Sequence, residues 1–124
     1  MIDHVSVGVS DLDRAARFYE AVLAPLGLTR LVTRAATIGL GKAYPEFWIN
    51  LRPGMARVVP ESGVHICLRA KSSADVDAFH TAALDAGGAS DGAPGLRPHD
   101  RVRYYAAFIL DPDGNRIEAV TFPA

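Results

Sequence analysis

The chain has a single cysteine, no excess of either charge and no long hydrophobic run, and each shortage excludes a class of protein. Cys67 has no partner for an internal disulfide, which fits a reducing compartment. A formal net charge of −1 gives no attraction to nucleic acid or to an anionic membrane surface. The longest apolar run, Tyr104 to Leu110, is far too short to span a bilayer. No secretory signal is apparent at the N-terminus, and we predict a cytoplasmic protein.

The composition is that of a globular protein. Hydrophobic residues make up 49% of the 124 positions and charged residues 22%, which is neither disordered nor fibrous in character. A chain of this length forms one domain of ordinary size and can bury a core without disulfides. We therefore expect a single domain over residues 1–124.

A pattern of residues occurs twice. It begins at His4 as HVSVGVSDLDRAARFYEAVLAPLG and again at His65 as HICLRAKSSADVDAFHTAALDAGG, a shift of 61 positions that also aligns Phe18 with Phe79. A repeat at a fixed shift indicates one supersecondary unit used twice. If the two copies face each other, their equivalent imidazoles can converge on one site, and imidazole is the commonest metal ligand in proteins.

Hydrophobic periodicity predicts the order β-α-β-β-β in each half, with the division near residues 60–62. In the first half, Ser10 is the expected helix cap, with Asp11 and Asp13 at the positive end of the helix dipole, and Pro25 and Gly27 end the helix. The strands expected around this helix are 2–9, 28–33, 36–40 and 46–52.

In the second half, a strand over 64–68 precedes a helix capped by Ser72 or Ser73 and stopped at Gly87 and Gly88. A Gly- and Pro-rich loop is expected from Gly92 to Pro98. Strands over 104–110 and 116–122 flank the segment DPDGN, which is typical of a tight turn.

Alternation within the predicted strands places four polar residues on the face away from the helices: His4, Asn50, His65 and Glu118. We therefore predict an α+β fold of two β-α-β-β-β modules, about 1–60 and 61–124, forming a cupped sheet around a cavity with the helices outside. Two histidines and one carboxylate with open positions is a known catalytic metal arrangement. The alternative is a polar cavity in which Glu118 pairs with a histidine and no metal is bound.

Three motifs resemble those of the vicinal oxygen chelate superfamily: His4-Val-Ser-Val, Gly63-Val-His65-Ile and DPDGNRIE ending at Glu118. That superfamily includes glyoxalase I, bleomycin-resistance proteins, fosfomycin-resistance thiol transferases and extradiol dioxygenases. The resemblance covers the whole chain. It implies that His4, His65 and Glu118 bind a divalent metal (Zn, Mn, Fe(II) or Ni) and that the chain forms a homodimer. A fourth ligand would fall at Asn50, and a neutral amide there counts against glyoxalase I activity.

Two functions follow from this resemblance. The first is a metal-dependent enzyme, a lyase, transferase or dioxygenase, that acts on a small oxygenated molecule by chelating its oxygens. In this case Glu118 is a ligand first, and it transfers a proton only if it leaves the metal. The second is a metal-free protein that binds and sequesters a small molecule, with affinity supplied by Trp48 and the tyrosines. We expect no nucleic-acid or membrane partner for either.

The candidate substrate-binding residues are Trp48, Asn50, Cys67, His99, Arg103 and Tyr105. Trp48 is either a stacking wall or part of the core, and Cys67 is a reactive thiol, a soft ligand or, as we favour, a small buried filler. One of Tyr104 and Tyr105 should face the cavity, although a continuous apolar run does not say which one.

The segment Gly92 to Arg103 is predicted to be a mobile lid whose basic residues approach a bound anion. His80 and Arg17 are expected on the exposed faces of the two helices.

Overall fold

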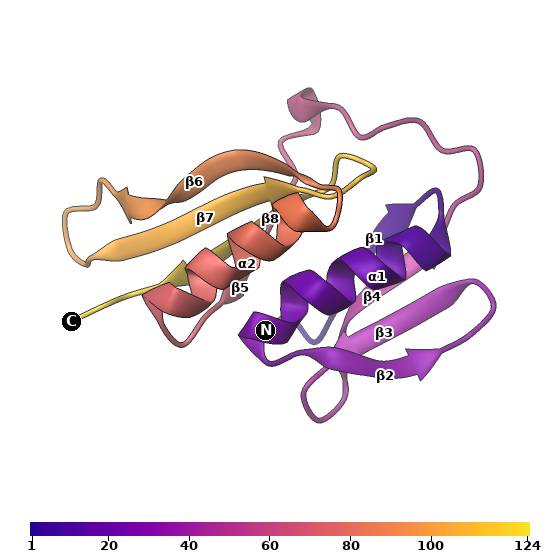
Figure 1. Cartoon of the computed structure of the whole chain (residues 1–124), viewed down its shortest axis with the longest axis horizontal. Helices are drawn as coiled ribbons and strands as arrows, with labels where there is room; N and C mark the ends of the chain where they lie inside the picture. The colour runs from indigo at the N-terminus through magenta and orange to yellow at the C-terminus, as the bar shows by residue number, and fades with distance from the viewer.

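The computed structural model describes residues 1–124 as two modules with the same order of elements (Figure 1). The first module contains β1 (Val5–Val9), α1 (Leu12–Leu23), β2 (Thr29–Thr33), β3 (Thr37–Gly41) and β4 (Pro45–Leu51). The second contains β5 (Ile66–Arg69), α2 (Ser73–Asp85), β6 (Ala89–Arg97), β7 (Tyr104–Leu110) and β8 (Arg116–Thr121). Short 3-10 turns lie at Ala24–Leu26 and Pro60–Ser62. The predicted β-α-β-β-β repeat is confirmed.

Each module forms its own four-stranded sheet. The orders are β1-β4-β3-β2 and β5-β8-β7-β6, with the first and last strands of each module paired in parallel and the other neighbours antiparallel. A parallel pair needs a long crossover, and α1 and α2 begin that crossover on one face of each sheet. The predicted α+β class is confirmed, and the two sheets do not close into a barrel.

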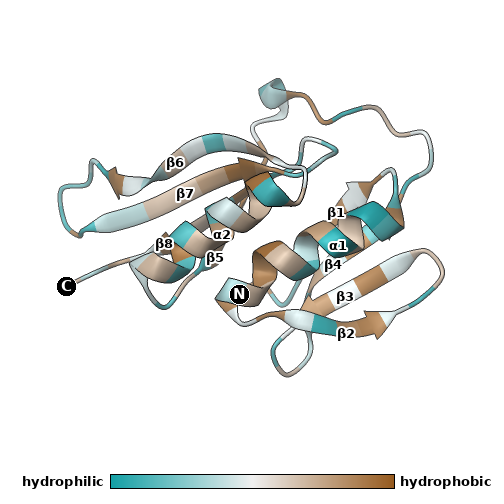
Figure 2. Ribbon diagram, in the orientation of Figure 1, coloured by the Kyte–Doolittle hydropathy of each residue, from teal (hydrophilic) through white to brown (hydrophobic).

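The two helices lie side by side and join the modules into one core (Figure 1). One cluster of 22 buried hydrophobic residues runs through both modules, including Phe18 and Phe47 from the first and Phe79 and Ile109 from the second. The apolar side of α1 is turned inward, which explains the alternation of hydrophobic and polar residues along this helix in Figure 2. The face of each sheet opposite its helix is left free. Neither helix has the length and apolar character needed to cross a membrane.

The cap of α1 differs from the prediction. Asp11 is the cap residue, and its carboxylate accepts a hydrogen bond of 3.0 Å from the backbone N–H of Arg14. Ser10 is instead held by Asp113 of the second module, whose carboxylate accepts from the Ser10 hydroxyl at 2.5 Å and from its backbone N–H at 3.1 Å. Ser72 caps α2 as predicted.

The predicted loop from Gly92 to Pro98 is wrong, because residues 89–97 form strand β6. The glycines and the proline interrupt the pairing of β6 with β7, where the register shifts between Ser90 and Gly92 and again between Gly92 and Gly95. Glycine and proline often mark such irregularities within an edge strand. The proposed lid is therefore reduced to the connection between β6 and β7, residues 98–103.

His80 also differs from the prediction, because it is buried rather than on the surface. Its side chain faces β6, and its Nε2 atom lies 2.8 Å from the hydroxyl of Ser90. Arg17 is exposed, as expected.

Candidate functional site

A row of polar side chains occupies the helix-free face of the second sheet. Glu118 of β8 pairs with Cys67 of β5 on one side and with Phe108 of β7 on the other. Residues that pair directly across strands point to the same face, so these three side chains share one surface. Tyr104 points to the same face, because it lies four positions before Phe108 on β7 and side chains two or four positions apart in a strand share a face.

Glu118 is the buried centre of this surface. Glu118 is only 2% exposed, and each of its carboxylate oxygens has a hydrogen-bond partner. Nε2 of His65 lies 3.1 Å from Oε1, and the hydroxyl of Tyr104 donates to Oε2. A buried carboxylate is tolerated because such partners replace the water it has lost.

Tyr104 is held in its protonated form. Burial raises the pKa of its hydroxyl well above the usual value, and the hydrogen bond and negative charge of Glu118 raise it further. A phenolate beside a carboxylate would place two negative charges in contact. Tyr104 is therefore a fixed hydrogen-bond donor to Glu118.

Cys67 lies on the same surface as an exposed thiol, not as the buried filler that we favoured. Partial desolvation and then the charge of Glu118 raise the pKa of this thiol to about 12. Because the thiolate is the nucleophilic form, Cys67 is a weak nucleophile here in spite of its exposure.

The tyrosine of the site is Tyr104 and not Tyr105. Tyr105 points to the opposite face of β7, where its hydroxyl donates to the carboxylate of Asp77 on α2 at 2.6 Å. Successive side chains of a strand point to opposite faces, so only one of the two could reach Glu118. The expectation that Tyr105 binds substrate is corrected accordingly.

His4 lies beside His65 but not beside Glu118. It is an exposed residue before β1 whose Nδ1 atom lies 2.7 Å from the carboxylate of its neighbour Asp3. His4 and His65 both line a pocket of about 360 Å³ between the edges of the two sheets, together with Glu46 and Cys67. Nowhere in the chain do three His, Cys, Asp or Glu side chains gather closely enough to hold a metal ion.

Asn50 and Trp48 lie on the first sheet. The side-chain oxygen of Asn50 accepts a hydrogen bond of 2.5 Å from the hydroxyl of Thr37 on the adjacent strand. Trp48 is half-buried, and the guanidinium of Arg34 lies 5.7 Å from the centre of its ring. Neither residue lines a pocket with His65.

Two residues of the predicted lid support the end of β7 rather than a pocket. The ring of His99 stacks on that of Tyr104, with 6.0 Å between centres and 13° between planes. Arg103 donates to the backbone carbonyl of the C-terminal Ala124 at 2.8 Å.

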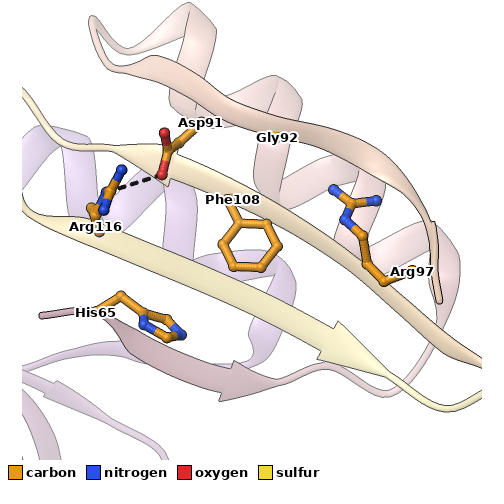
Figure 3. A pocket seen from close by; sticks show the side chains of 6 residues that line it. All are labelled: His65, Asp91, Gly92, Arg97, Phe108 and Arg116. Atoms are coloured by element: carbon orange, nitrogen blue, oxygen red, sulfur yellow. Dashed lines mark ion pairs between the residues drawn. The ribbon is translucent and has the colours of Figure 1, made fainter. Parts of the chain in front are cut away.

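A second pocket, of about 330 Å³, adjoins His65 on the second sheet (Figure 3). Its lining residues are His65, Asp91, Gly92, Arg97, Phe108 and Arg116. Asp91, Phe108 and Arg116 were not predicted from the sequence. The signal for Arg116 was available, because it lies two positions before Glu118 on β8 and so shares its face.

The fold of this chain is that of a glyoxalase-like protein: two β-α-β-β-β modules, with an imidazole–carboxylate pair on the helix-free face of the second sheet. Residues 1–119 match the family described as the Glyoxalase/Bleomycin resistance protein/Dioxygenase superfamily, and the chain belongs to that superfamily. The resemblance seen in the sequence motifs is confirmed.

Known relatives agree with this assignment. The chain is 32% identical over 123 residues to a metallothiol transferase FosB of Shouchella clausii, a match that covers 97% of this chain and 79% of the relative. The crystal structure of a glyoxalase/bleomycin resistance protein from Albidiferax ferrireducens superimposes with a TM-score of 0.83 at 32% identity, over 94% of this chain and 95% of that one. Glyoxalase I from Zea mays shares the fold, with a TM-score of 0.69 at 22% identity over 95% of this chain and 44% of that one.

Proposed function

We propose that this chain is a divalent-metal-dependent enzyme that acts on a small oxygenated molecule, with His4, His65 and Glu118 as ligands. The observation that carries the proposal is the Glu118 carboxylate, which is 2% exposed yet lies on the open face of a sheet and contacts a half-exposed imidazole. A purely structural carboxylate has no need of a solvent-accessible histidine as its partner.

The donor set fits a metal ion in part. Glu118 and His65 present their donor atoms 3.1 Å apart, a separation compatible with two ligands of one ion at bond lengths of about 2.0–2.2 Å. His4 lies across the neighbouring pocket and would have to move or come from another copy of the chain to be the third ligand. Imidazole and carboxylate are donors that suit zinc, ferrous iron, manganese and nickel.

A divalent cation bound there would act as a Lewis acid that polarises the oxygens of a substrate. The chain's own residues have separate tasks. Tyr104 holds a proton against Oε2 of Glu118 and so orients the carboxylate. Phe108 supplies the apolar wall beside His65, with 6.1 Å between the two ring centres.

The relative from Shouchella clausii supports this reading, because it is named a metallothiol transferase and the match covers 97% of this chain. We propose for this chain the metal dependence and a small-molecule substrate, with lyase, transferase or dioxygenase chemistry.

The alternative is a metal-free protein that binds and sequesters a small molecule. It is favoured by one observation, which is that His65, Tyr104 and Glu118 satisfy one another by hydrogen bonds without an ion. In that case Glu118 is a structural acceptor, and an aromatic surface that includes Trp48 supplies the affinity.

Calorimetric titration of chelator-treated protein with Zn²⁺, Mn²⁺, Ni²⁺ and anaerobic Fe²⁺ separates the two functions. We expect the parent to bind at least one ion at one site per chain, and Glu118→Gln and His65→Ala to weaken binding by more than about 100-fold. Glu61→Gln is the control, since it removes an exposed carboxylate of the Pro60–Ser62 turn that has no bond to the proposed ligands. Absence of binding by the parent, or an equal loss in the control, overturns the metal site.

His4 and Asn50 are tested in the same titration. We expect His4→Ala to weaken binding by more than about tenfold and Asn50→Ala to have little effect, because the Asn50 amide is already bonded to Thr37. Equal losses in both variants would show that Asn50 is a ligand.

We further propose that the chain is a cytoplasmic homodimer. Large apolar side chains are exposed near the open edges of the two sheets, with Ile2 80% and Val64 66% accessible. A contiguous exposed apolar patch marks a contact surface, and the dimer proposal takes these residues to be part of one. Sedimentation equilibrium across a range of concentrations checks the dimer, and a monomer at every concentration contradicts it.

A further inference from the structure

The hydrogen bond from Tyr104 to Glu118 joins residues that are not direct neighbours in the sheet. Glu118 pairs across the strands with Phe108, and Tyr104 lies four positions before Phe108 on β7. At about 3.3 Å per residue, this offset along the strands is about 13 Å. Side chains of a sheet usually stand roughly perpendicular to it. The ring of Tyr104 must instead lie along the sheet, because only then does its hydroxyl reach Oε2 of Glu118.

Two buried apolar residues lie under this path. Ala106 is 0% exposed and Val120, its partner across the strands, is 6% exposed. Both lie between Tyr104 and Glu118 on the helix-free face, and neither belongs to the hydrophobic core that the two modules share. No helix covers this face, so a side chain must. A Tyr104 ring that lies along the sheet toward Glu118 accounts for the burial of both residues.

Two further rings contact Tyr104. Phe122 follows Thr121, the partner of Tyr105, and so falls opposite Tyr104 across the strands. Its ring meets that of Tyr104 edge-on, with 5.4 Å between centres and 85° between planes. The ring of His99 lies parallel to that of Tyr104 at 6.0 Å. Edge-on and stacked contacts are the favourable geometries for aromatic pairs, so Tyr104 is held from two directions.

The two flanking rings are themselves anchored. The guanidinium of Arg69 on β5 lies 4.5 Å from the centre of the Phe122 ring, within the range of a cation–π contact. Nδ1 of His99 accepts hydrogen bonds from the backbone N–H groups of Arg101 and Val102, at 3.1 and 3.2 Å. Both rings are therefore fixed although they are exposed. Through His99, the connection between β6 and β7 supports Tyr104.

The Tyr104 hydroxyl determines how the Glu118 carboxylate is turned. The terminal torsion of a glutamate side chain is broad, so the side chain itself does not fix it. Tyr104 donates to Oε2, and Oε1 is then the oxygen that faces Nε2 of His65, at 3.1 Å. Loss of this donor would free the carboxylate to rotate away from His65.

We propose that Ala106, Phe122 and His99 are positioning residues that hold the Tyr104 ring along the sheet, so that its hydroxyl keeps Oε1 of Glu118 directed at His65. Ala106 contributes by being small, since a larger side chain there would lift the ring from the sheet. This arrangement needs no metal to form. The proposal rests on the proposed function only in that the oriented oxygen is then a metal ligand.

The first test follows the hydroxyl proton of Tyr104 by NMR in the chelator-treated full chain. Tyr104→Phe identifies the resonance by removing it. We expect this proton to exchange with water at least about tenfold more slowly than that of Tyr105, whose bond to the exposed Asp77 lies on the opposite face. A Tyr104 hydroxyl that exchanges as fast as that of Tyr105 overturns the proposal.

Substitutions assign the effect to residues. Ala106→Leu, Phe122→Leu and His99→Leu should each accelerate the exchange by about threefold or more, because they displace the ring or release it. Phe122→Tyr and His99→Phe keep an aromatic contact and should stay within about twofold of the parent. Unchanged exchange in the three leucine variants, or an equal acceleration in the two variants that keep a ring, refutes the positioning role.

The second test uses the metal titration. Tyr104→Phe should weaken binding by about tenfold or more, and Phe122→Leu by about threefold or more. Combined with Tyr104→Phe, Phe122→Leu should have no further effect beyond about 1.5-fold, because it acts through the hydroxyl that is already absent. An equal loss in both backgrounds assigns Phe122 a merely structural role and refutes the proposal. A parent that binds no metal refutes the proposed metal site alone, and the hydroxyl exchange then decides whether Tyr104 is positioned.

Discussion

Glu118 controls the chemistry of the residues around it. Its charge and its hydrogen bonds raise the pKa of both Tyr104 and Cys67, after burial, which is the largest cause for each. Burial and this carboxylate together extend the pH range over which the phenol and the thiol stay protonated well above neutral pH. At the scale of the residue, the site is a set of proton donors arranged around one acceptor.

Cys67 offers a direct test of this electrostatic control. With a pKa of about 12, the thiol should react with iodoacetamide at pH 8 at least about tenfold more slowly than a free cysteine, although it is exposed. Glu118→Gln should accelerate the reaction, because it removes the negative charge that opposes the thiolate. Mass spectrometry of chelator-treated protein follows the alkylation. Equal rates in the parent and the variant would show that burial alone sets the reactivity.

At the scale of the element, α2 is attached to β6 by a buried histidine. His80 of α2 bonds the hydroxyl of Ser90 on β6, and burial lowers its pKa below 6.5, with Asp77 opposing the change. The folded state therefore binds a proton less readily than the unfolded state does. Stability is highest when the imidazole is neutral in both states and falls as protonation of the unfolded chain begins.

We expect the free energy of unfolding to fall as the pH drops from about 6.5 toward the pKa of His80 in the folded state. Below that pKa, His80 is protonated in both states and causes no further loss of stability. His80→Gln keeps a polar group for Ser90 and should show a flatter dependence between pH 7 and 5. Urea unfolding at a series of pH values measures both proteins. The same slope in the variant would assign the pH dependence to other groups.

The connection between α2 and β6 depends on a close contact at Gly88. A Cβ atom there would lie 2.5 Å from the carbonyl oxygen of Leu110 and 2.6 Å from the ring of Phe18. Gly88→Ala should destabilise the chain by about 2–3 kcal/mol, because backbone cannot move aside cheaply. Gly95→Ala is the matched control, since its Cβ would approach no atom more closely than 3.4 Å, and we expect a change within about 0.5 kcal/mol. Thermal unfolding compares the two, and similar effects would contradict the steric argument.

At the scale of the whole molecule, the DPDGN turn fastens the second module to the first. Asp111 accepts a hydrogen bond of 2.6 Å from Tyr19 of α1, and Asn115 donates to the carbonyl of Gly8 at 2.9 Å. Asp113 holds Ser10 through two further bonds. These contacts join residues about a hundred positions apart. The DPDGN segment therefore has a structural task in addition to preceding Glu118.

Tyr19→Phe tests this connection without changing the packing. Asp111 is 1% exposed, and burial raises its pKa while its hydrogen bonds lower it, so the loss of one donor should cost about 1–3 kcal/mol of stability. Tyr105→Phe removes a similar bond to the exposed Asp77 and should cost less than about 0.5 kcal/mol, because water replaces the tyrosine. Denaturant unfolding measures both variants. An equal loss of stability in the two variants would show that the hydrogen bond from Tyr19 to Asp111 does not stabilise the fold more than the exposed bond does.

Local patterns in the sequence were sufficient for the repeated module. The 61-residue shift between His4 and His65, and the alternation around Glu118, predicted the element order and the face on which Glu118 lies, because side-chain direction in a strand follows from period two alone. The turn at DPDGN was equally readable, since Gly114 takes the positive φ of 89° that such a turn requires.

Other features depended on contacts between distant segments. Ser10 was expected to cap α1 and instead bonds Asp113. Residues 92–98 were expected to be a loop, and instead residues 89–97 form a strand that pairs with β7, because β-pairing can override a local preference for turns. The register of β7 against β8 decides that Tyr104, and not Tyr105, faces Glu118. The irregular pairing of β6 with β7 around Gly92 places Arg97 against Phe108. The sequence by itself determined which residue types face away from the helices. Only the tertiary structure decided which of them meet, because that depends on register and on the packing of one module against the other.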